Sequence, residues 1–347
     1  MDFGGGDDIR FERKGKAGIV TLTRPKALNA INHVMIQALS SALEAWREDA
    51  DVAVVAIRAE GRAFSAGGDI LDIYQAGLAG NPPVEFFADE YRLNATIARF
   101  PKPYVALIDG IVMGGGVGVS CHGSHRVMTE NAQFAMPEVG IGFFPDVGGS
   151  HLLPELGGHF GMYLGLTGNR IRHGDALWSG VATHTTKAEY LDGIVERLAE
   201  TGDADLALRE AFVPAQRETP EKVLEAINLY FSRSSLPALL ESLNAAAAGD
   251  EFAARTLATL QSRSPTSVNV AFRQITEGQA LDMDACMRME FRIVNRMLRG
   301  HDFYEGIRAA IIDKDGEPIW QPATLRDVDP AEIDAYFAPL PDGDLSL

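Results

Sequence analysis

Two glycine clusters are the first features of this chain whose residue types suit chemistry. Ala66-Gly67-Gly68 lies in a loop expected over residues 60–69, and Gly114-Gly115-Gly116 follows an apolar segment that is typical of a buried strand. Glycine at a strand-to-helix turn exposes backbone N–H groups, and a helix N-terminus adds positive potential there. Such N–H groups can stabilise a developing oxyanion, although a glycine cluster by itself is more often a tight turn.

Two carboxylates, Glu138 and Asp146, bracket an apolar loop, and each of them follows a proline. A lone Glu after Pro is usually solvated, and a lone Asp before Val-Gly-Gly is more often a helix N-cap. Two carboxylates on one apolar loop are a stronger sign, because desolvation can hold the pKa of one of them near neutrality. The loop therefore favours an acid, a base or a nucleophile.

Other motifs in this region fail on spacing. Residues 114–123 fit neither the dinucleotide fingerprint G-x-G-x-x-G nor the phosphate loop G-x-x-x-x-G-K-[ST]. Residues 118–122 resemble a serine-hydrolase elbow but place His122 where that turn needs glycine. His122 and His125 have no third ligand at metal-site spacing, so no metal site is expected.

The elements that must position these residues follow from hydrophobic periodicity and from helix-breaking residues. Strands are expected at 9–13, 17–22, 52–58, 104–108 and 125–129, and helices at 32–49, 83–100, 114–123 and 148–156. This alternation predicts an α/β core over residues 9–185, preceded by a disordered tail at 1–8. Residues 186–347 are mostly helical, with candidates at 191–198, 220–230, 236–248 and 289–298. No linker separates them, so they are expected to complete the same unit.

Charge and composition exclude several classes of partner. The chain has 347 residues and a formal net charge of −17, with 31 Lys and Arg against 48 Asp and Glu, which argues against nucleic acid and anionic membranes. The most apolar long segment, 104–123, is interrupted by Asp109 and by glycines, so no membrane span is expected. Two distant cysteines and the absence of a signal-peptide pattern at residues 1–10 favour a cytoplasmic protein.

Four longer segments carry a resemblance to a known family. RAFSAGGDI (62–70) and IDGIVMGGGVGV (108–119) resemble the crotonase, or enoyl-CoA hydratase/isomerase, superfamily. FAMPEVGIGFFPDVGG (134–149) and RGHDFYEGIRAAIIDKDGEPIWQPA (299–323) resemble its 3-hydroxyisobutyryl-CoA hydrolase branch. The match covers about residues 9–338. It implies an α/β crotonase-like spiral of ββα turns with a helical C-terminal region.

The resemblance also implies an acyl-CoA thioester as substrate. By similarity, the N–H groups of Gly68 and Gly115 form an oxyanion hole for the thioester carbonyl, and the acids of the substrate site are Glu90, Glu138 and Asp146. The residues implied to border the CoA moiety are Lys26, Ala27, Leu28, Ala66, Asp69, Ile70 and Leu71. CoA is part of the substrate, and no separate cofactor is expected.

Gly118 decides between the activities of the superfamily. Hydratases of this superfamily carry one acid shortly after the triple glycine and another at the Pro-Glu, and here the first position is Gly118. The resemblance therefore implies hydrolysis, with 3-hydroxyisobutyryl-CoA, a compound of valine catabolism, as the expected substrate. The alternatives are an enoyl-CoA hydratase or isomerase and a non-catalytic acyl-CoA binder. Relatives of this kind commonly form trimers or hexamers, and a homo-oligomer is expected on that ground alone.

Overall fold

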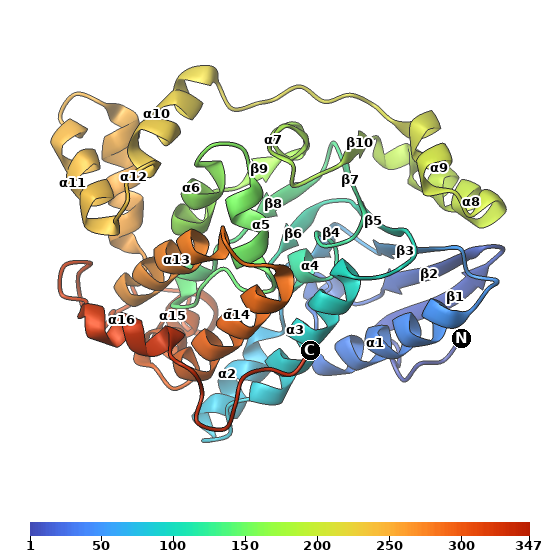
Figure 1. Cartoon of the computed structure of the whole chain (residues 1–347), viewed down its shortest axis with the longest axis horizontal. Coiled ribbons are helices and arrows are strands. Elements are labelled where there is room, and N and C mark those ends of the chain that lie inside the picture. The colour runs from blue at the N-terminus through green and yellow to red at the C-terminus, as the bar shows by residue number, and fades with distance from the viewer. The chain divides into compact units, whose positions relative to one another are not determined.

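The computed structural model describes all residues, 1–347 (Figure 1). They fall into two compact units. Unit 1 comprises Met1–Asp69, Asp89–Phe134 and Ile171–Glu218, and unit 2 comprises Ile70–Ala88, Ala135–Arg170 and Thr219–Leu347. Each unit is thus assembled from three separate segments. The boundary expected after residue 185 falls inside the last segment of unit 1, and the expected division into domains stays a prediction.

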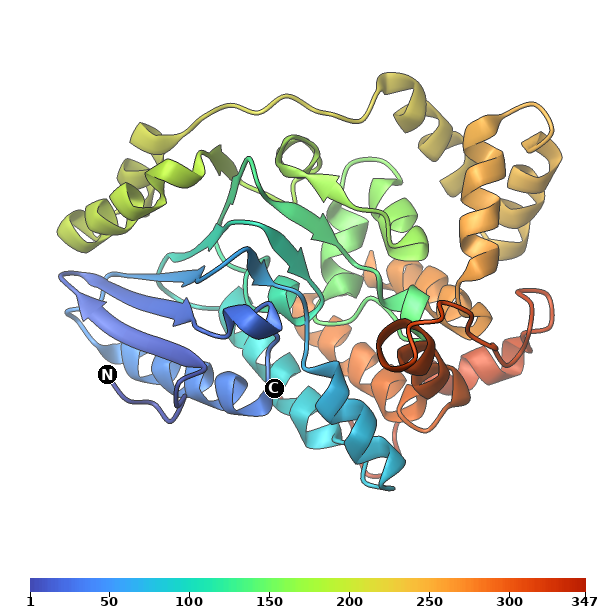
Figure 2. The ribbon, with the colours of Figure 1, turned by 180° about the vertical axis from the view of Figure 1, so that it is seen from behind.

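A six-stranded sheet forms the centre of unit 1, in the order β1-β2-β3-β5-β7-β10. Its strands are β1 (Ile9–Lys14), β2 (Ala17–Leu22), β3 (Val54–Ala59), β5 (Tyr104–Ile108), β7 (His125–Thr129) and β10 (His184–Thr186). β1 and β2 pair antiparallel as the hairpin at one edge (Figure 2), and the other neighbours are parallel. Parallel strands buried on both faces read as continuous apolar runs, as Tyr104–Ile108 does.

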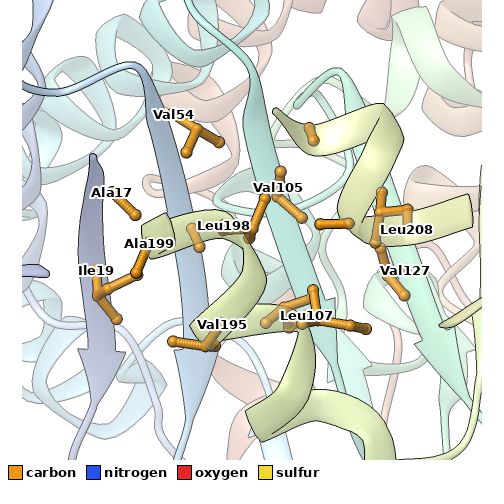
Figure 3. Packing of buried hydrophobic residues seen from close by; sticks show 14 residues of the cluster. Ala17, Ile19, Val54, Val105, Leu107, Val127, Val195, Leu198, Ala199 and Leu208 are labelled. Carbon is orange, nitrogen blue, oxygen red and sulfur yellow. The ribbon is translucent and has the colours of Figure 1, made fainter. Parts of the chain in front are cut away.

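Helices cover both faces of this sheet. α8 (Leu191–Thr201) and α9 (Ala204–Ala211) bury Leu198 and Leu208 against Val105 and Val127, in the cluster shown in Figure 3. On the other face lies α1 (His33–Glu48), where a Cβ added to Gly18 would come within 2.7 Å of the indole ring of Trp46. The sheet is therefore held between two helical layers within unit 1.

A second, four-stranded sheet sets the two glycine clusters side by side. Its order is β4 (Ala63–Ser65), β6 (Ile111–Met113), β8 (Gln133–Ala135) and β9 (Ile171–Arg172). β4 and β6 pair in parallel, with Ser65 opposite Val112. Because β4 ends just before Ala66 and β6 ends just before Gly114, both glycine clusters leave the same edge of this sheet. The second cluster leads into the short helix α4 (Gly115–Gly118).

Unit 2 is mostly helical. It contains α2 (Ile70–Leu78), the 3₁₀ turn η2 (Glu138–Ile141), α5 (Gly149–Glu155), α6 (Phe160–Thr167), α10 (Glu221–Phe231), α11 (Leu236–Ala246), α12 (Glu251–Ser262), α13 (Pro265–Gly278), α14 (Met283–Met297), α15 (His301–Ile307), a π-helix (Arg308–Ile312) and α16 (Pro330–Phe337). α5 packs against α6, α13 and α14. None of the helices of the chain combines the length and the apolar character needed to cross a membrane.

The α/β class with a helical C-terminal region is confirmed, with differences in particular elements. The strands expected at 104–108 and 125–129 have those bounds. The helix expected over 114–123 ends at Gly118, because glycines are poor helix formers and the carbonyl of Val119 accepts a hydrogen bond from the Tyr104 hydroxyl at 2.8 Å. At the start of the chain, Phe3 packs edge-on against Phe11 and Trp46.

Four further elements lie wholly or partly in unit 1. These are the 3₁₀ turn η1 (Pro25–Ala27), α3 (Val84–Ala98, which begins in unit 2), α7 (His173–Ser179) and the 3₁₀ turn η3 (Ala188–Tyr190). α3 carries Glu90 on its buried side, and Asn32 caps α1 by accepting a hydrogen bond from the Met35 N–H at 2.9 Å, as its sequence predicts.

Candidate active site

Backbone hydrogen bonds join the two segments expected to border CoA. The Ile31 N–H donates to the Gly67 carbonyl at 2.8 Å, and the Asp69 N–H returns a bond to the Ile31 carbonyl at 2.8 Å. The Ala66 N–H donates to the Leu28 carbonyl at 3.0 Å. Leu28 and Ala66 are thus brought together, and the 66–69 loop is fixed by pairing with the chain that follows η1.

The turn after η1 is strained, and a buried amide stabilises it. Leu28 and Asn29 have φ values of 52° and 54°, in the left-handed region that costs non-glycine residues energy. The Asn29 side chain accepts from the Arg24 N–H at 2.8 Å and donates to the carbonyls of Glu60 and Ala63, each at 2.8 Å. These bonds hold Lys26 and Ala27 in place at the start of the turn.

Charge on this segment is partly neutralised. The Arg24 guanidinium contacts the Asp69 carboxylate at 2.9 Å, so Asp69 is engaged in an ion pair inside the predicted CoA border. Lys26 is exposed. The remaining two predicted border residues, Ile70 and Leu71, begin α2 in unit 2, where Leu71 is 41% exposed.

The two glycines expected to form the oxyanion hole lie close to each other and to Glu90. A Cβ added to Gly115 would stand 3.3 Å from the Gly68 nitrogen and 2.8 Å from Glu90 Oε1. Glu90 is only 2% exposed. Gly68, Gly115 and Glu90 therefore share one small space within unit 1, and a side chain at position 115 would require Glu90 to shift.

Glu138 and Asp146 come together in unit 2. Glu138 opens η2, is 6% exposed, and its Oε2 is buried without a hydrogen-bond partner. Burial is the main cause that raises the pKa of Glu138 well above its usual range, and the nearby charges of Asp146 and Glu290 raise it further. Asp146 is itself 5% exposed. A carboxyl group held in this way keeps its proton to higher pH than an exposed carboxyl does, and it is a stronger base once ionised.

Close packing fixes η2, the turn that carries Glu138. The Ser264 N–H donates to the Val139 carbonyl at 3.2 Å, and the Ser264 hydroxyl donates to Asp302 at 2.6 Å. Gly142, with φ of 72°, closes η2 against the backbone of Asp302, where an added Cβ would meet the carbonyl oxygen at 1.9 Å. Only glycine fits this position, so the backbone of η2 has little freedom.

Sequence reasoning missed two polar residues of the carboxylate cluster. Glu290 of α14 is fully buried, and burial raises its pKa to about 8. Gln274 of α13, also fully buried, donates to the Pro145 carbonyl. A signal for Glu290 was present in the sequence: Met287 and Ile293 lie three residues on either side of it, so it occupies the apolar stripe of its helix.

Asn94, one turn after Glu90 on α3, was also missed. It is fully buried, and neither its side-chain oxygen nor its nitrogen has a hydrogen-bond partner within the chain. Such groups are costly in a folded protein and concentrate at sites that bind a ligand or water. No periodic or motif signal in the sequence marks this residue.

Each unit holds groups that suit chemistry by themselves. Within unit 1, the backbone N–H groups of Gly68 and Gly115 are of the kind that stabilises an oxyanion. Within unit 2, the buried carboxyl of Glu138 has a raised pKa and is of the kind that acts as an acid, a base or a nucleophile. Gly118 is buried in α4 and has no side chain. The chain therefore has no acid at the position where a hydratase would carry its first one.

A family model described as enoyl-CoA hydratase/isomerase matches residues 17–337. The chain is 43% identical to the mitochondrial 3-hydroxyisobutyryl-CoA hydrolase of Danio rerio, over 99% of this chain and 92% of that protein. The sequence resemblance stated above, including the hydrolase branch, is confirmed by these matches.

Two solved structures are also similar. A carnitinyl-CoA dehydratase from Mycobacterium thermoresistibile superposes with a TM-score of 0.91 at 36% identity, over 97% of this chain and 98% of that one. An enoyl-CoA hydratase from Rhodobacter sphaeroides 2.4.1 gives a TM-score of 0.88 at 37% identity, over 98% of this chain and 100% of that one. These likenesses confirm the expected spiral fold.

One expectation is wrong. The chain was expected to be cytoplasmic, whereas the Danio rerio relative is described as mitochondrial. The physical basis of that expectation was too weak, because reduced cysteines exclude only an oxidising environment and do not distinguish one reducing compartment from another.

Proposed function

This chain belongs to the enoyl-CoA hydratase/isomerase, or crotonase, family, and we propose that it hydrolyses a short hydroxyacyl-CoA thioester, with 3-hydroxyisobutyryl-CoA as its substrate. The observation that carries the proposal is the buried pair Glu138 and Asp146 in a chain whose other acid position is Gly118. The name of the Danio rerio relative supports the choice of substrate. With that substrate the reaction is a step of valine degradation.

The first part of the proposed mechanism is the oxyanion hole. The thioester carbonyl accepts hydrogen bonds from the N–H groups of Gly68 and Gly115, which strengthen as negative charge develops on the oxygen. One such donor is worth roughly 3 to 4 kcal/mol of the barrier. The proximity of Gly68 to Gly115 supports this assignment.

The second part is attack on the carbonyl carbon. The Glu138 carboxylate adds to this carbon, the C–S bond breaks, CoA leaves as thiolate, and water then hydrolyses the mixed anhydride. In the other route, Glu138 removes a proton from water, the water oxygen attacks the carbonyl carbon directly, and the C–S bond breaks so that CoA leaves as thiolate. The raised pKa of Glu138 supports both routes, because it makes the ionised carboxylate a stronger base and nucleophile.

Other residues bind and orient the substrate in this proposal. Asp146 binds the substrate hydroxyl or positions water, and Glu90 lies at the acyl end. Lys26, Ala27, Leu28, Ala66, Asp69, Ile70 and Leu71 border CoA, with Lys26 as the exposed cation. No separate cofactor takes part, because CoA belongs to the substrate.

A thiol-release assay over a panel of hydroxyacyl-CoA and enoyl-CoA thioesters tests the proposal. We expect free thiol to appear from 3-hydroxyisobutyryl-CoA. We expect the conjugated absorbance of crotonyl-CoA to stay unchanged. The two similar solved structures, a dehydratase and a hydratase, favour a second candidate, hydration of an enoyl-CoA. Loss of crotonyl-CoA absorbance without thiol would establish that activity, and tight CoA binding with neither signal would establish a non-catalytic binder.

A homo-oligomer, a trimer or a hexamer, is a further expectation from the family resemblance. Light scattering of the purified chain measures it directly, and a monomer at working concentrations would contradict it.

A further inference from the structure

Glu290 makes three hydrogen bonds to the chain that follows Asp146. Its Oε2 accepts from the Gly148 N–H at 2.9 Å, and its Oε1 accepts from the Ser150 N–H at 2.9 Å and also contacts the Ser150 hydroxyl. Gly148 and Ser150 lie at the start of α5, whose first N–H groups have no partner within the helix. A side chain from α14 therefore caps the N-terminal end of α5, next to Asp146.

The turn that Glu290 holds is strained. Val147 has φ of 50°, a genuine outlier for a β-branched residue, and Gly148 follows with φ of 86°. A conformation of this kind costs of order 1 to 3 kcal/mol and persists only where the surroundings over-determine it. The surroundings here are Gln274, which donates to the Pro145 carbonyl, and Glu290 on the other side of Asp146. The strained turn is thus fixed on both sides of the carboxylate.

From this geometry we infer that Glu290 is a positioning residue for Asp146 and the third member of a buried carboxylate cluster with Glu138 and Asp146. The inference rests on the proposed function, because it assigns a role in the same site. Glu290 does not touch the reacting atoms; it fixes the backbone that aims Asp146, and its charge acts on both of the other acids.

The cluster is coupled through charge as well as through the backbone. Glu290 is among the groups whose charge raises the pKa of Glu138, and Asp146 raises the pKa of both glutamates. On α14 itself, the Cys286 thiol shares Ser150 with Glu290. No positive charge among these groups offsets the repulsion.

Two charged groups on other helices packed against α14 are engaged elsewhere. Arg273 of α13 pairs with Glu277 and with Asp334 of α16. Asp302 of α15 accepts a hydrogen bond from Ser264. Asp146 is the charged group that raises the pKa of Glu290, and Glu290 in turn raises the pKa of Glu138.

The test is the pH profile of thiol release by the Glu290→Gln variant. Glutamine keeps the size of the side chain, but its NH₂ group cannot accept from an N–H, so the turn relaxes and kcat falls roughly 10- to 100-fold. Above about pH 8, where Glu290 is ionised in the wild type, removal of its charge also lowers the pKa of Glu138, so the rising limb of kcat against pH shifts to lower pH. A purely structural role would lower the amount of folded enzyme without shifting this limb.

A second variant and a control distinguish the proposed role of Glu290 from an effect of misfolding. Ser150→Ala removes the hydroxyl contact but leaves both N–H bonds, and that hydroxyl lowers the pKa of Glu290. Its loss leaves Glu290 neutral more often, so a smaller shift of the limb in the same direction is expected. The control is Asp175→Asn in unit 1, a buried acid that accepts the Glu218 N–H at 2.8 Å and is not among the groups acting on Glu138. It should leave the limb in place.

Failure of this inference can be told apart from failure of the proposed function. If the wild type releases thiol and both Glu290→Gln and Ser150→Ala keep its kcat and its pH limb, the inference is overturned while the function stands. If the wild type releases no thiol, the proposed function fails. Titration of ¹³C-labelled Glu and Asp carboxyls then tests the inference about Glu290 without any activity. An unchanged Glu138 titration in folded Glu290→Gln overturns the inference, and a shift to lower pH supports it.

Discussion

A buried carboxylate oxygen without a partner, such as Glu138 Oε2, costs stability that folding alone does not require. Natural proteins keep such groups where function uses them, and perturbed carboxyl pKa values concentrate at the same places. Asp146 and Glu290, both buried, lie in the same unit as Glu138, and their charges raise the pKa of Glu138 further.

Position 115 tests the oxyanion assignment. In Gly115→Ala the added Cβ would stand 2.8 Å from Glu90 Oε1 and 3.3 Å from the Gly68 nitrogen, so the hole and Glu90 must shift. We expect kcat for thiol release to fall about 10- to 100-fold with the fold retained. The matched control is Gly193→Ala on α8, where nothing lies within 4 Å of the new Cβ. Full activity in Gly115→Ala would remove Gly115 from the mechanism.

Elements are positioned by burial on particular faces, and the cover of the six-stranded sheet by α8 is the clearest case. Leu198 of α8 is fully buried in the cluster of Figure 3, so Leu198→Ala leaves a cavity and should lower the free energy of unfolding by about 2 to 5 kcal/mol. Urea unfolding measures the loss. The control, Leu229→Ala on α10, changes a side chain that is 54% exposed and should cost about 0.5 kcal/mol or less. Equal losses in both variants would contradict this packing.

Periodic elements could be predicted from the sequence, and irregular ones could not. Apolar residues at spacings of three and four, with Asn32 as a cap, predicted α1, and β-branched runs predicted β3 and β5. η2 is set by contacts of Ser264 with Val139 and of Asp302 with Gly142, which join residues more than a hundred positions apart and leave no local signal. The strained turn at Val147 was likewise invisible, because its hydrogen bonds come from α13 and α14.

The residues of the candidate site also divide into those that the sequence marks and those that it does not. The glycine clusters and the two loop acids were found because their residue types break local rules in an apolar context, whereas Glu290 and Gln274 were missed because they lie in ordinary helices. Family resemblance supplied Glu90, which no pattern marks. The compartment was predicted wrongly, since a whole-molecule property was argued from two cysteines and ten residues.

For the whole molecule, buried acids make stability depend on pH. The folded-state pKa of Glu290, about 8, lies above the usual 4.5, so the folded state binds this proton more tightly than the unfolded state does. Its contribution to stability is complete below pH 4.5 and is lost as the pH rises through 8. We expect the free energy of unfolding in urea to fall by about 2 kcal/mol more between pH 6 and pH 9 in the wild type than in Glu290→Gln. Parallel losses in the two proteins would contradict the assignment.

The central claim is that Glu138 drives cleavage of an acyl-CoA thioester, and one comparison tests it most directly. Thiol release from 3-hydroxyisobutyryl-CoA is measured for the wild type and for Glu138→Gln, together with CoA affinity by calorimetry. The account predicts that the wild type turns over, that the variant releases no thiol above background, and that both bind CoA with similar affinity. A Glu138→Gln variant with the turnover of the wild type would contradict it.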